Sequence, residues 1–221
     1  MFIVKYYRYS MNTKVLNIFS LVLFIPFYIL ICVLGYSSYI DFKCLIIYFL
    51  WMILHEFLHG IGFSFSNVSH RSIVYGANLE KGFFYCMCKD NISKIGIMIS
   101  LMFPFFFIGV LTLVFGFIFN VPILIILSLF NIAGCAGDLA MFFSFIRLPN
   151  FSYIDLDDCT GFVLISDNDL SAYRLFGMSL VESGSYSDLG SANDFRKFTI
   201  SKLSWIIFGV MLLFLFISFI V

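Results

Sequence analysis

The chain contains five apolar stretches that are long enough, or nearly long enough, to cross a lipid bilayer as helices. A helix needs about 20 consecutive apolar residues to span the hydrocarbon core. Only 12% of the 221 residues are charged and 62% are hydrophobic, whereas a soluble domain carries about 25% charged residues. Too little polar surface remains to cover a water-soluble globule, so we expect a multi-pass membrane protein. The five predicted spans are residues 15–36, 43–64, 95–119, 121–146 and 204–221.

Three basic residues, Lys5, Arg8 and Lys14, precede the first apolar stretch, as they do in a secretory signal peptide. The stretch is longer than the roughly 7–15 apolar residues of a signal peptide, and no A-x-A cleavage site follows it. We therefore interpret it as a retained membrane anchor.

The distribution of Lys and Arg predicts the orientation of the chain. Twelve of the 13 lie in the N-terminal arm, in the loop 65–94 or in the segment 147–203, and only Lys43 lies elsewhere. By the positive-inside rule, this bias places the N-terminus and both long polar segments in the cytoplasm. The net charge is zero and no large basic cluster exists, so no nucleic-acid partner is expected.

Two segments outside the spans have the composition of β-hairpins. Residues 71–77 and 82–88 are rich in β-branched and aromatic residues and flank a turn at 79–82, and residues 151–166 suggest a second strand pair around 157–161. We therefore predict an all-α membrane protein of four to five transmembrane helices, with only small cytoplasmic β-hairpin elements.

The second predicted span contains His55, Glu56 and His59 in the pattern H-E-x-x-H. Residues four apart lie on one face of a helix, about 6 Å apart, so both imidazoles can bind one metal ion. The intervening carboxylate can accept a proton from a zinc-bound water. The alternative is that all three are buried polar residues that join helices. Ionisable groups at membrane depth each cost roughly 2.5–3.5 kcal/mol, and a bound Zn²⁺ compensates that cost.

A catalytic zinc takes a third protein ligand and leaves one position open for water. The metzincin continuation requires a histidine at position 65, which is Phe65 here. Three candidates remain, Glu80, His70 and Asp138. Glu80 has a spacing close to that of gluzincins but lies at the tip of a predicted hairpin, and His70 lies at the membrane edge next to a basic residue.

Depth in the membrane favours Asp138 as the third ligand. At 1.5 Å per residue, His55 and His59 lie roughly 18 and 24 Å from the outer edge, and Asp138 lies roughly 25 Å from it. Small residues at 133–137 allow close helix packing beside it. Asn131, two turns earlier on the same face, can orient Asp138 or bind a substrate carbonyl.

At these residues the chain resembles a bacterial family of zincin peptidases. The shared features are H-E-x-x-H in a span, an apolar span with Pro104, the segment Gly137-Asp138-Leu139 and an Asp-rich turn before Gly161. The resemblance divides a single integral membrane domain, residues 1–221, into a zincin-like core at about 40–166, a Ser/Gly/Asp-rich loop at 167–203 and a C-terminal transmembrane helix at 204–221.

More distantly, the chain resembles the site-two proteases, which cut substrates within the membrane. Those enzymes carry N-x-x-P-x-x-x-L-D-G in a later span. Here Asn131 matches, but Gly134 replaces the proline and Asp138 comes one position early.

These observations predict a zinc metalloprotease that hydrolyses membrane proteins or membrane-proximal peptides near the cytoplasmic face. Zinc is held by His55, His59 and Asp138, and Glu56 is the general base. The alternative from another class is a non-catalytic metal-binding membrane protein with a regulatory or immunity role. Glu56 discriminates between the two, because metal binding alone needs no carboxylate beside the ligands.

Overall fold

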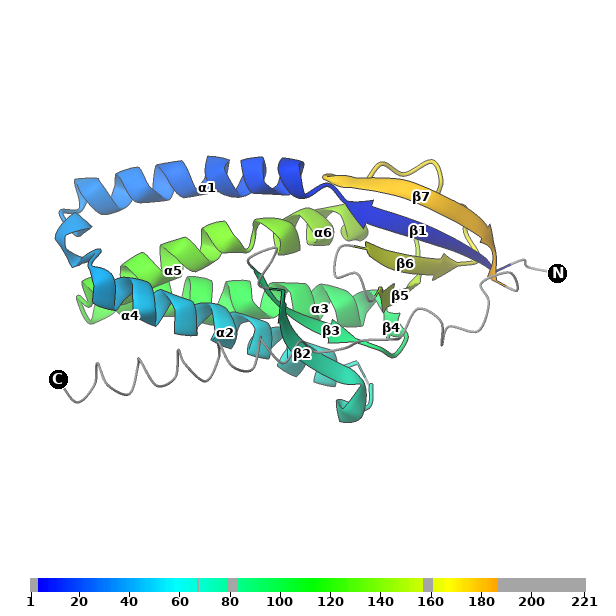
Figure 1. Cartoon of the computed structure of the whole chain (residues 1–221), viewed down its shortest axis with the longest axis horizontal. Coiled ribbons are helices and arrows are strands. Elements are labelled where there is room, and N and C mark those ends of the chain that lie inside the picture. The colour runs from blue at the N-terminus through cyan, green and yellow to red at the C-terminus, as the bar shows by residue number, and fades with distance from the viewer. Residues whose placement is uncertain (1–3, 67, 79–82, 157–160, 187–221) are drawn as a thin grey trace.

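The computed structural model describes residues 4–66, 68–78, 83–156 and 161–186. The protein is elongated, with a bundle of helices at one end and a β-sheet at the other (Figure 1). The predicted span at 204–221, the end of the 167–203 segment and Glu80 lie outside the described residues.

Within the described part, three helices are long and apolar enough to cross a membrane. One bent pair of helices passes the same test if the pair is counted as a single span, which would be the fourth. The bent pair turns by 50° at Cys135. The helices are α1 (Thr13–Val33), α2 (Phe42–Ser64), the continuous series α3 (Lys94–Pro104), π-helix η3 (Phe105–Leu111) and α4 (Thr112–Ile118), and the pair α5 (Pro122–Gly134) and α6 (Ala136–Ile146), with short 3₁₀ helices η1 (Ser37–Tyr39) and η2 (His70–Ser72).

Local sequence explains where these helices begin. The side chains of Asn12, Asp41 and Ser93 cap α1, α2 and α3, each accepting a hydrogen bond from a backbone N–H of the first turn. Such caps satisfy donors that have no partner within the helix. α5 begins instead with Pro122, a residue whose fixed φ suits the first helical position.

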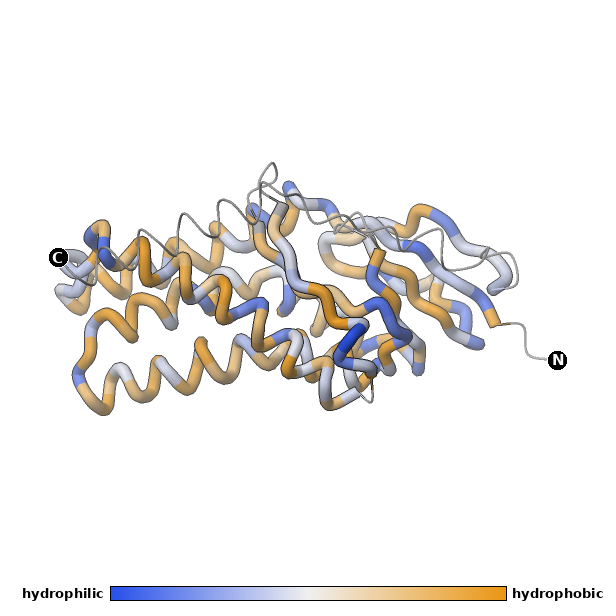
Figure 2. The backbone as a smooth tube through the Cα atoms, turned by 60° about the horizontal axis from the view of Figure 1, so that its bottom comes forward, coloured by the Kyte–Doolittle hydropathy of each residue, from blue (hydrophilic) through white to orange (hydrophobic). Residues whose placement is uncertain are grey.

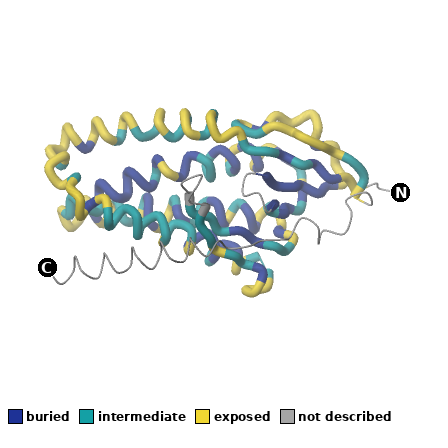
Figure 3. The backbone as a smooth tube through the Cα atoms, viewed as in Figure 1, coloured by how far each residue is buried: buried dark blue, intermediate teal, exposed yellow. Residues whose placement is uncertain are grey.

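The outer surface of the bundle is apolar. Ile18, Leu21 and Val22 of α1 are 63%, 55% and 59% exposed. Apolar residues run along the helices in Figure 2, and much of α1 is exposed in Figure 3. A surface of this kind requires lipid rather than water as its neighbour, which agrees with the membrane protein expected from the sequence.

The prediction of an all-α fold is wrong, because the structure contains two antiparallel sheets. The larger sheet has five strands in the order β4-β5-β6-β1-β7, and the smaller sheet is the hairpin β2-β3. The strands are β1 (Lys5–Met11), β2 (Ile73–Asn78), β3 (Phe83–Cys88), β4 (Ile92–Ser93), β5 (Ser152–Asp155), β6 (Gly161–Ser166) and β7 (Met178–Ser185).

Two of the missed strands owe their structure to distant partners. β1, which we expected to be a charged arm, pairs with β6 on one side and with β7 on the other. β7 lies in the segment that we expected to be a loop, and its residues are mostly exposed. Both pairings join segments separated by more than 150 residues, so neither strand has a local signal that a periodicity argument can detect.

The two hairpins predicted from composition are confirmed. Ile73 pairs with Cys88 at the open end of the β2-β3 hairpin, and Ser152 pairs with Ile165 in the second pair. Their turns, residues 79–82 and 157–160, lie outside the described residues.

A cluster of buried residues attaches the five-stranded sheet to the ends of α2, α3 and α6. It includes Tyr7 and Phe162 from the sheet, together with Phe63, Ile97 and Phe145 from the helices. α1 leaves this end of the bundle, α2 returns to it, α3 leaves it and α6 returns (Figure 1). The sheet, the β2-β3 hairpin and the last turns of α2 therefore share one end of the molecule.

Candidate metal centre

His55, Glu56 and His59 lie in the second half of α2, toward the end that is close to the sheet. His59 is five residues before the end of the helix, which is about 7.5 Å along its axis. His59 is buried, and His55 and Glu56 are partly buried. Asp138 lies in the first turn of α6, just after the bend that follows α5.

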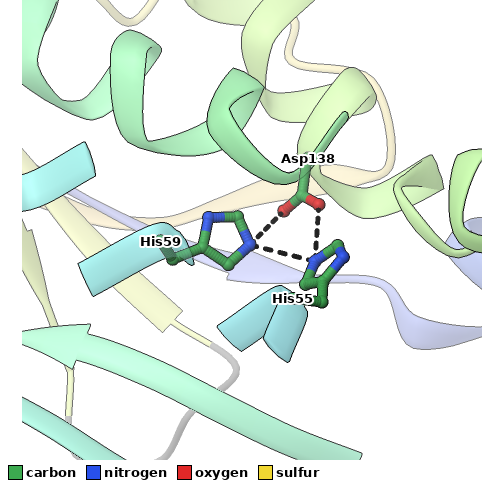
Figure 4. Close-up of side chains that lie close together, drawn as sticks. All are labelled: His55, His59 and Asp138. Atoms are coloured by element: carbon green, nitrogen blue, oxygen red, sulfur yellow. Dashed lines mark hydrogen bonds and ion pairs between the residues drawn. The ribbon is translucent and has the colours of Figure 1, made fainter. Parts of the chain in front are cut away.

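These segments bring His55, His59 and Asp138 together (Figure 4). The Nε2 atoms of the two histidines are 3.1 Å apart. Oδ2 of Asp138 is 3.3 Å from Nε2 of His55, and Oδ1 is 3.5 Å from Nε2 of His59. Three side chains from two separate helices therefore converge on one point.

The distances match those of a tetrahedral zinc site. Ligand atoms about 2.1 Å from zinc and arranged tetrahedrally lie about 3.4 Å from one another. The 3.1 Å between the two Nε2 atoms is close to that value, as are the 3.3 and 3.5 Å from these nitrogens to the two different oxygens of Asp138. Two imidazoles and one carboxylate also form a donor set that zinc commonly takes, with one position left for water.

The contacts on the other ring nitrogens direct both histidines toward the metal position. Nδ1 of His55 lies 2.9 Å from Oδ1 of Asn131, and Nδ1 of His59 lies 2.9 Å from the backbone oxygen of Ser100. Both partners are acceptors, so each Nδ1 carries the proton and each Nε2 presents a lone pair. Two lone pairs and a carboxylate then face one another. A proton can bridge only one pair of these atoms, whereas a metal ion satisfies all three.

The helix that carries Ser100 approaches α2 very closely. An added Cβ on Gly62 would lie 2.5 Å from Cα of Ser100, a contact that backbone atoms cannot relieve without moving. Glycine at this position therefore allows α3 to reach the histidines. The oxygen of Ser100 can then serve as the acceptor for His59.

The π-helix after Pro104 supplies further contacts near the site. A π-helix shifts backbone carbonyls away from regular helical partners, and such turns occur often at functional sites. Here the carbonyl of Pro104 accepts a hydrogen bond from Nδ2 of Asn131, and that of Ile108 accepts one from Nε1 of Trp51. Asn131 is thus held from its amide nitrogen while its oxygen faces His55. Its hydrogen-bonding contacts join it to His55, Pro104 and Cys135, and its expected role in orienting Asp138 or a substrate stays a prediction.

Glu56 faces the same cavity as the metal group. The cavity has a volume of about 380 Å³ and is lined by parts of α1, α2, α3, α6, the β2-β3 hairpin and β5. The backbone N–H of Cys86 in β3 donates a hydrogen bond to the Glu56 carboxylate. The outer edge of β3 therefore fixes this carboxylate beside the ligands.

Asp155 and Tyr153 also line the cavity, and sequence analysis did not single them out. Oδ2 of Asp155 accepts a hydrogen bond from the backbone N–H of Cys88 at 2.9 Å, and Oδ1 accepts one from the Tyr153 hydroxyl at 2.6 Å. Burial raises the pKa of Asp155 to about 6. In the sequence, the only signal for Asp155 was its position two residues after Tyr153 and next to the expected Asp-rich turn.

His70, another candidate for the third ligand, stands apart from this group. His70 is exposed, and its Nδ1 lies 3.4 Å from Oγ of Ser64, beyond the end of the metal group. Glu80 lies outside the described residues. Of the two candidates that the structure describes, Asp138 lies beside the two histidines and His70 does not.

The H-E-x-x-H helix and Asp138 of α6 thus form a group close enough to hold a metal ion, in a bundle whose helices are long enough to span a membrane. Residues 48–153 of this chain match a family described as putative zincin peptidase, which confirms the resemblance expected from the sequence. No curated protein and no solved structure matches the chain.

Proposed function

We propose that this protein is a membrane-embedded zinc metalloprotease. It hydrolyses peptide bonds of membrane proteins, or of peptides next to the membrane, near the cytoplasmic face of a bacterial cell membrane. The observation that carries the proposal is the convergence of two imidazole lone pairs and one carboxylate at zinc-ligand spacing, with Glu56 in the same cavity.

Each residue has a defined role in this reaction. His55, His59 and Asp138 would hold Zn²⁺, and Asn131 and Ser100 keep the two imidazoles in the tautomer that binds metal. Bound zinc supplies polarisation of the scissile carbonyl and lowers the pKa of a water molecule toward about 7. Glu56 accepts the proton of the attacking water and passes it to the leaving amine. The N–H of Cys86 keeps the Glu56 carboxylate in place.

The position of the site supports a substrate that comes from the membrane or its surface. The metal group lies inside the helical bundle, near the end that carries the sheet and eight of the nine described Lys and Arg residues. A folded soluble protein does not fit a cavity of about 380 Å³. An extended segment of a membrane protein does fit, once its own helix has unwound at the cleavage site.

The test of this proposal compares two membrane proteomes. Cells that produce the native protein and cells that produce Glu56→Gln are compared for membrane proteins that accumulate and for fragments that disappear. We expect the variant to retain its zinc and to lose cleavage, because an amide cannot accept the proton. Fragments that persist in the variant would reject the general-base role. Zinc in both proteins without any difference between the proteomes would favour the non-catalytic metal-binding alternative.

A further inference from the structure

One wall of the cavity comes from α1, a helix outside the region that matches the family. Thr13, Leu16, Asn17 and Ser20 of α1 line the cavity. Their spacing of three and four residues places them on one face of the helix. Three of the four are polar, whereas beyond Lys14 in the first turn the exposed residues on the rest of the helix, such as Ile18 and Val22, are apolar. The helix therefore presents a polar face to the cavity and apolar faces to lipid.

The polar side chains on this face differ in whether they already have partners. Oγ of Ser20 donates a hydrogen bond to the carbonyl of Ala133 and so joins α1 to α5. Thr13 and Asn17 make no side-chain hydrogen bond with any part of the chain that the structure describes. The Asn17 amide offers two donors and an acceptor, and these groups are available on the cavity side.

Beside α1, the cavity has open space next to the metal group. Gly134 and Gly137 line it. An added Cβ on Gly137 would meet nothing within 4 Å, and one on Gly134 would meet only the Tyr48 hydroxyl at 3.8 Å. The two glycines therefore leave room between α1 and the wall that carries His55 and Glu56.

The shape and polarity of this space fit an extended peptide. A volume of about 380 Å³ is at the lower end of the roughly 300–1,000 Å³ of small-ligand pockets, so it holds a few residues and no intact helix. A peptide unwound from a helix exposes backbone N–H and C=O groups, and each costs several kcal/mol in a membrane interior unless it finds a partner. An asparagine amide can pair with both groups of one residue.

We infer that Asn17 and Thr13 bind the backbone of the substrate segment and hold it extended across the cavity from the metal group. This inference rests on the proposed function, since it names the surface that presents the peptide to the metal and to Glu56. The occupant is an extended peptide segment, and its backbone, rather than a particular side chain, is what α1 binds.

Two metal-directed probes separate this inference from the proposed function. Acetohydroxamate binds a catalytic zinc and has no peptide part, whereas a tri-alanyl hydroxamate adds an extended backbone. Binding of each is measured by calorimetry on the zinc-loaded full chain in detergent. The variants are Asn17→Leu, which removes the amide from an exposed position, and Thr13→Val, which removes only a hydroxyl. The control is Ile18→Leu, on the neighbouring lipid-facing position.

In the native protein we expect the tri-alanyl compound to bind at least ten-fold more tightly than acetohydroxamate. Asn17→Leu should weaken the tri-alanyl compound about ten-fold, the loss expected for one or two hydrogen bonds, and Thr13→Val should weaken it by a smaller factor. Zinc content and acetohydroxamate binding should stay unchanged in both, and Ile18→Leu should behave as the native protein. If Asn17→Leu still binds acetohydroxamate and also binds the tri-alanyl compound as tightly as the native protein, the inference is overturned and the proposed function is not. A zinc-loaded native protein that binds neither compound would overturn the proposed function and the inference with it.

Discussion

His59 and Ser100 exchange two hydrogen bonds across the contact between α2 and α3. Nδ1 of His59 lies 2.9 Å from the backbone oxygen of Ser100, and the Ser100 hydroxyl donates to the backbone oxygen of His59 at 2.8 Å. The pair fixes both the position of the helix and the tautomer of the imidazole. Because Gly62 lies against Cα of Ser100, the distance between the two helices controls the orientation of a metal ligand.

This contact predicts the effect of Gly62→Ala. The added Cβ would lie 2.5 Å from Cα of Ser100 and would push α3 away from α2. Overpacking of this kind costs about 1–3 kcal/mol, so we expect a lower midpoint of thermal unfolding in detergent and a lower zinc content. The matched control is Gly134→Ala, whose added Cβ meets only the Tyr48 hydroxyl at 3.8 Å. Equal zinc content in the two variants would contradict the role assigned to this contact.

Asn131→Leu should weaken zinc binding without removing a ligand. The substitution deletes the oxygen that accepts the Nδ1 proton of His55. Loss of such a partner typically lowers metal affinity 10–100-fold, and competition with a fluorescent zinc chelator measures it. Asn131→Asp keeps an acceptor for His55 and should retain most of the affinity. If the Asn131→Leu protein binds zinc as tightly as the native protein does, then Asn131 does not orient His55.

The identity of the third ligand is tested by zinc stoichiometry. We expect about one zinc per purified chain, a loss of most of it in Asp138→Ala, and retention in His70→Ala and Glu80→Ala, measured by mass spectrometry of the metal. His70 is a matched control because it is a histidine near the same end of α2 but outside the metal group. If Glu80→Ala lacks zinc and Asp138→Ala retains it, the third ligand is Glu80 of the hairpin and not Asp138.

The candidate site was more predictable from sequence than the fold was. His55 and His59 have a separation fixed by the helix itself, and Asp138 is a carboxylate in an apolar span, so local rules identify all three. The β1 strand has no such signal, because its partners β6 and β7 are distant in the chain. Asp155 was missed for the same reason, since its partner Cys88 belongs to another hairpin. Asn17 faces the cavity only because of how α1 packs against α5 and α6.

The orientation in the membrane is tested by cysteine labelling in a chain without native cysteines. Ser171 is exposed at the end that carries the sheet, and Ser38 is exposed in the connection between α1 and α2. The positive-inside rule predicts that Ser38→Cys reacts with an impermeant maleimide from outside intact cells. Ser171→Cys should react only after permeabilisation. The reverse pattern would place the sheet and the proposed chemistry on the outer face.

The buried carboxyl of Asp155 should make the stability of the protein depend on pH between about 4 and 6. Burial raises its pKa to about 6 in the folded state, whereas an unfolded aspartate ionises near pH 3.9. The unfolded chain therefore releases this proton first as the pH rises. The contribution of Asp155 to stability is greatest below about pH 4, and it decreases by about 3 kcal/mol as the pH passes the folded pKa.

Thermal unfolding of the native protein and Asp155→Asn in detergent, from pH 4 to pH 7, measures this effect. The asparagine has no charge to bury, so its unfolding midpoint should rise relative to that of the native protein as the pH increases. Asp169→Asn is the control of opposite sign. Asp169 is exposed, and hydrogen bonds from Ser171 lower its pKa. The unfolding midpoint of Asp169→Asn should therefore fall relative to that of the native protein as the pH increases. A constant difference between native protein and Asp155→Asn across this range would show that Asp155 is ionised in the folded state throughout. Its hydrogen bonds from Tyr153 and Cys88 would then outweigh the cost of burial.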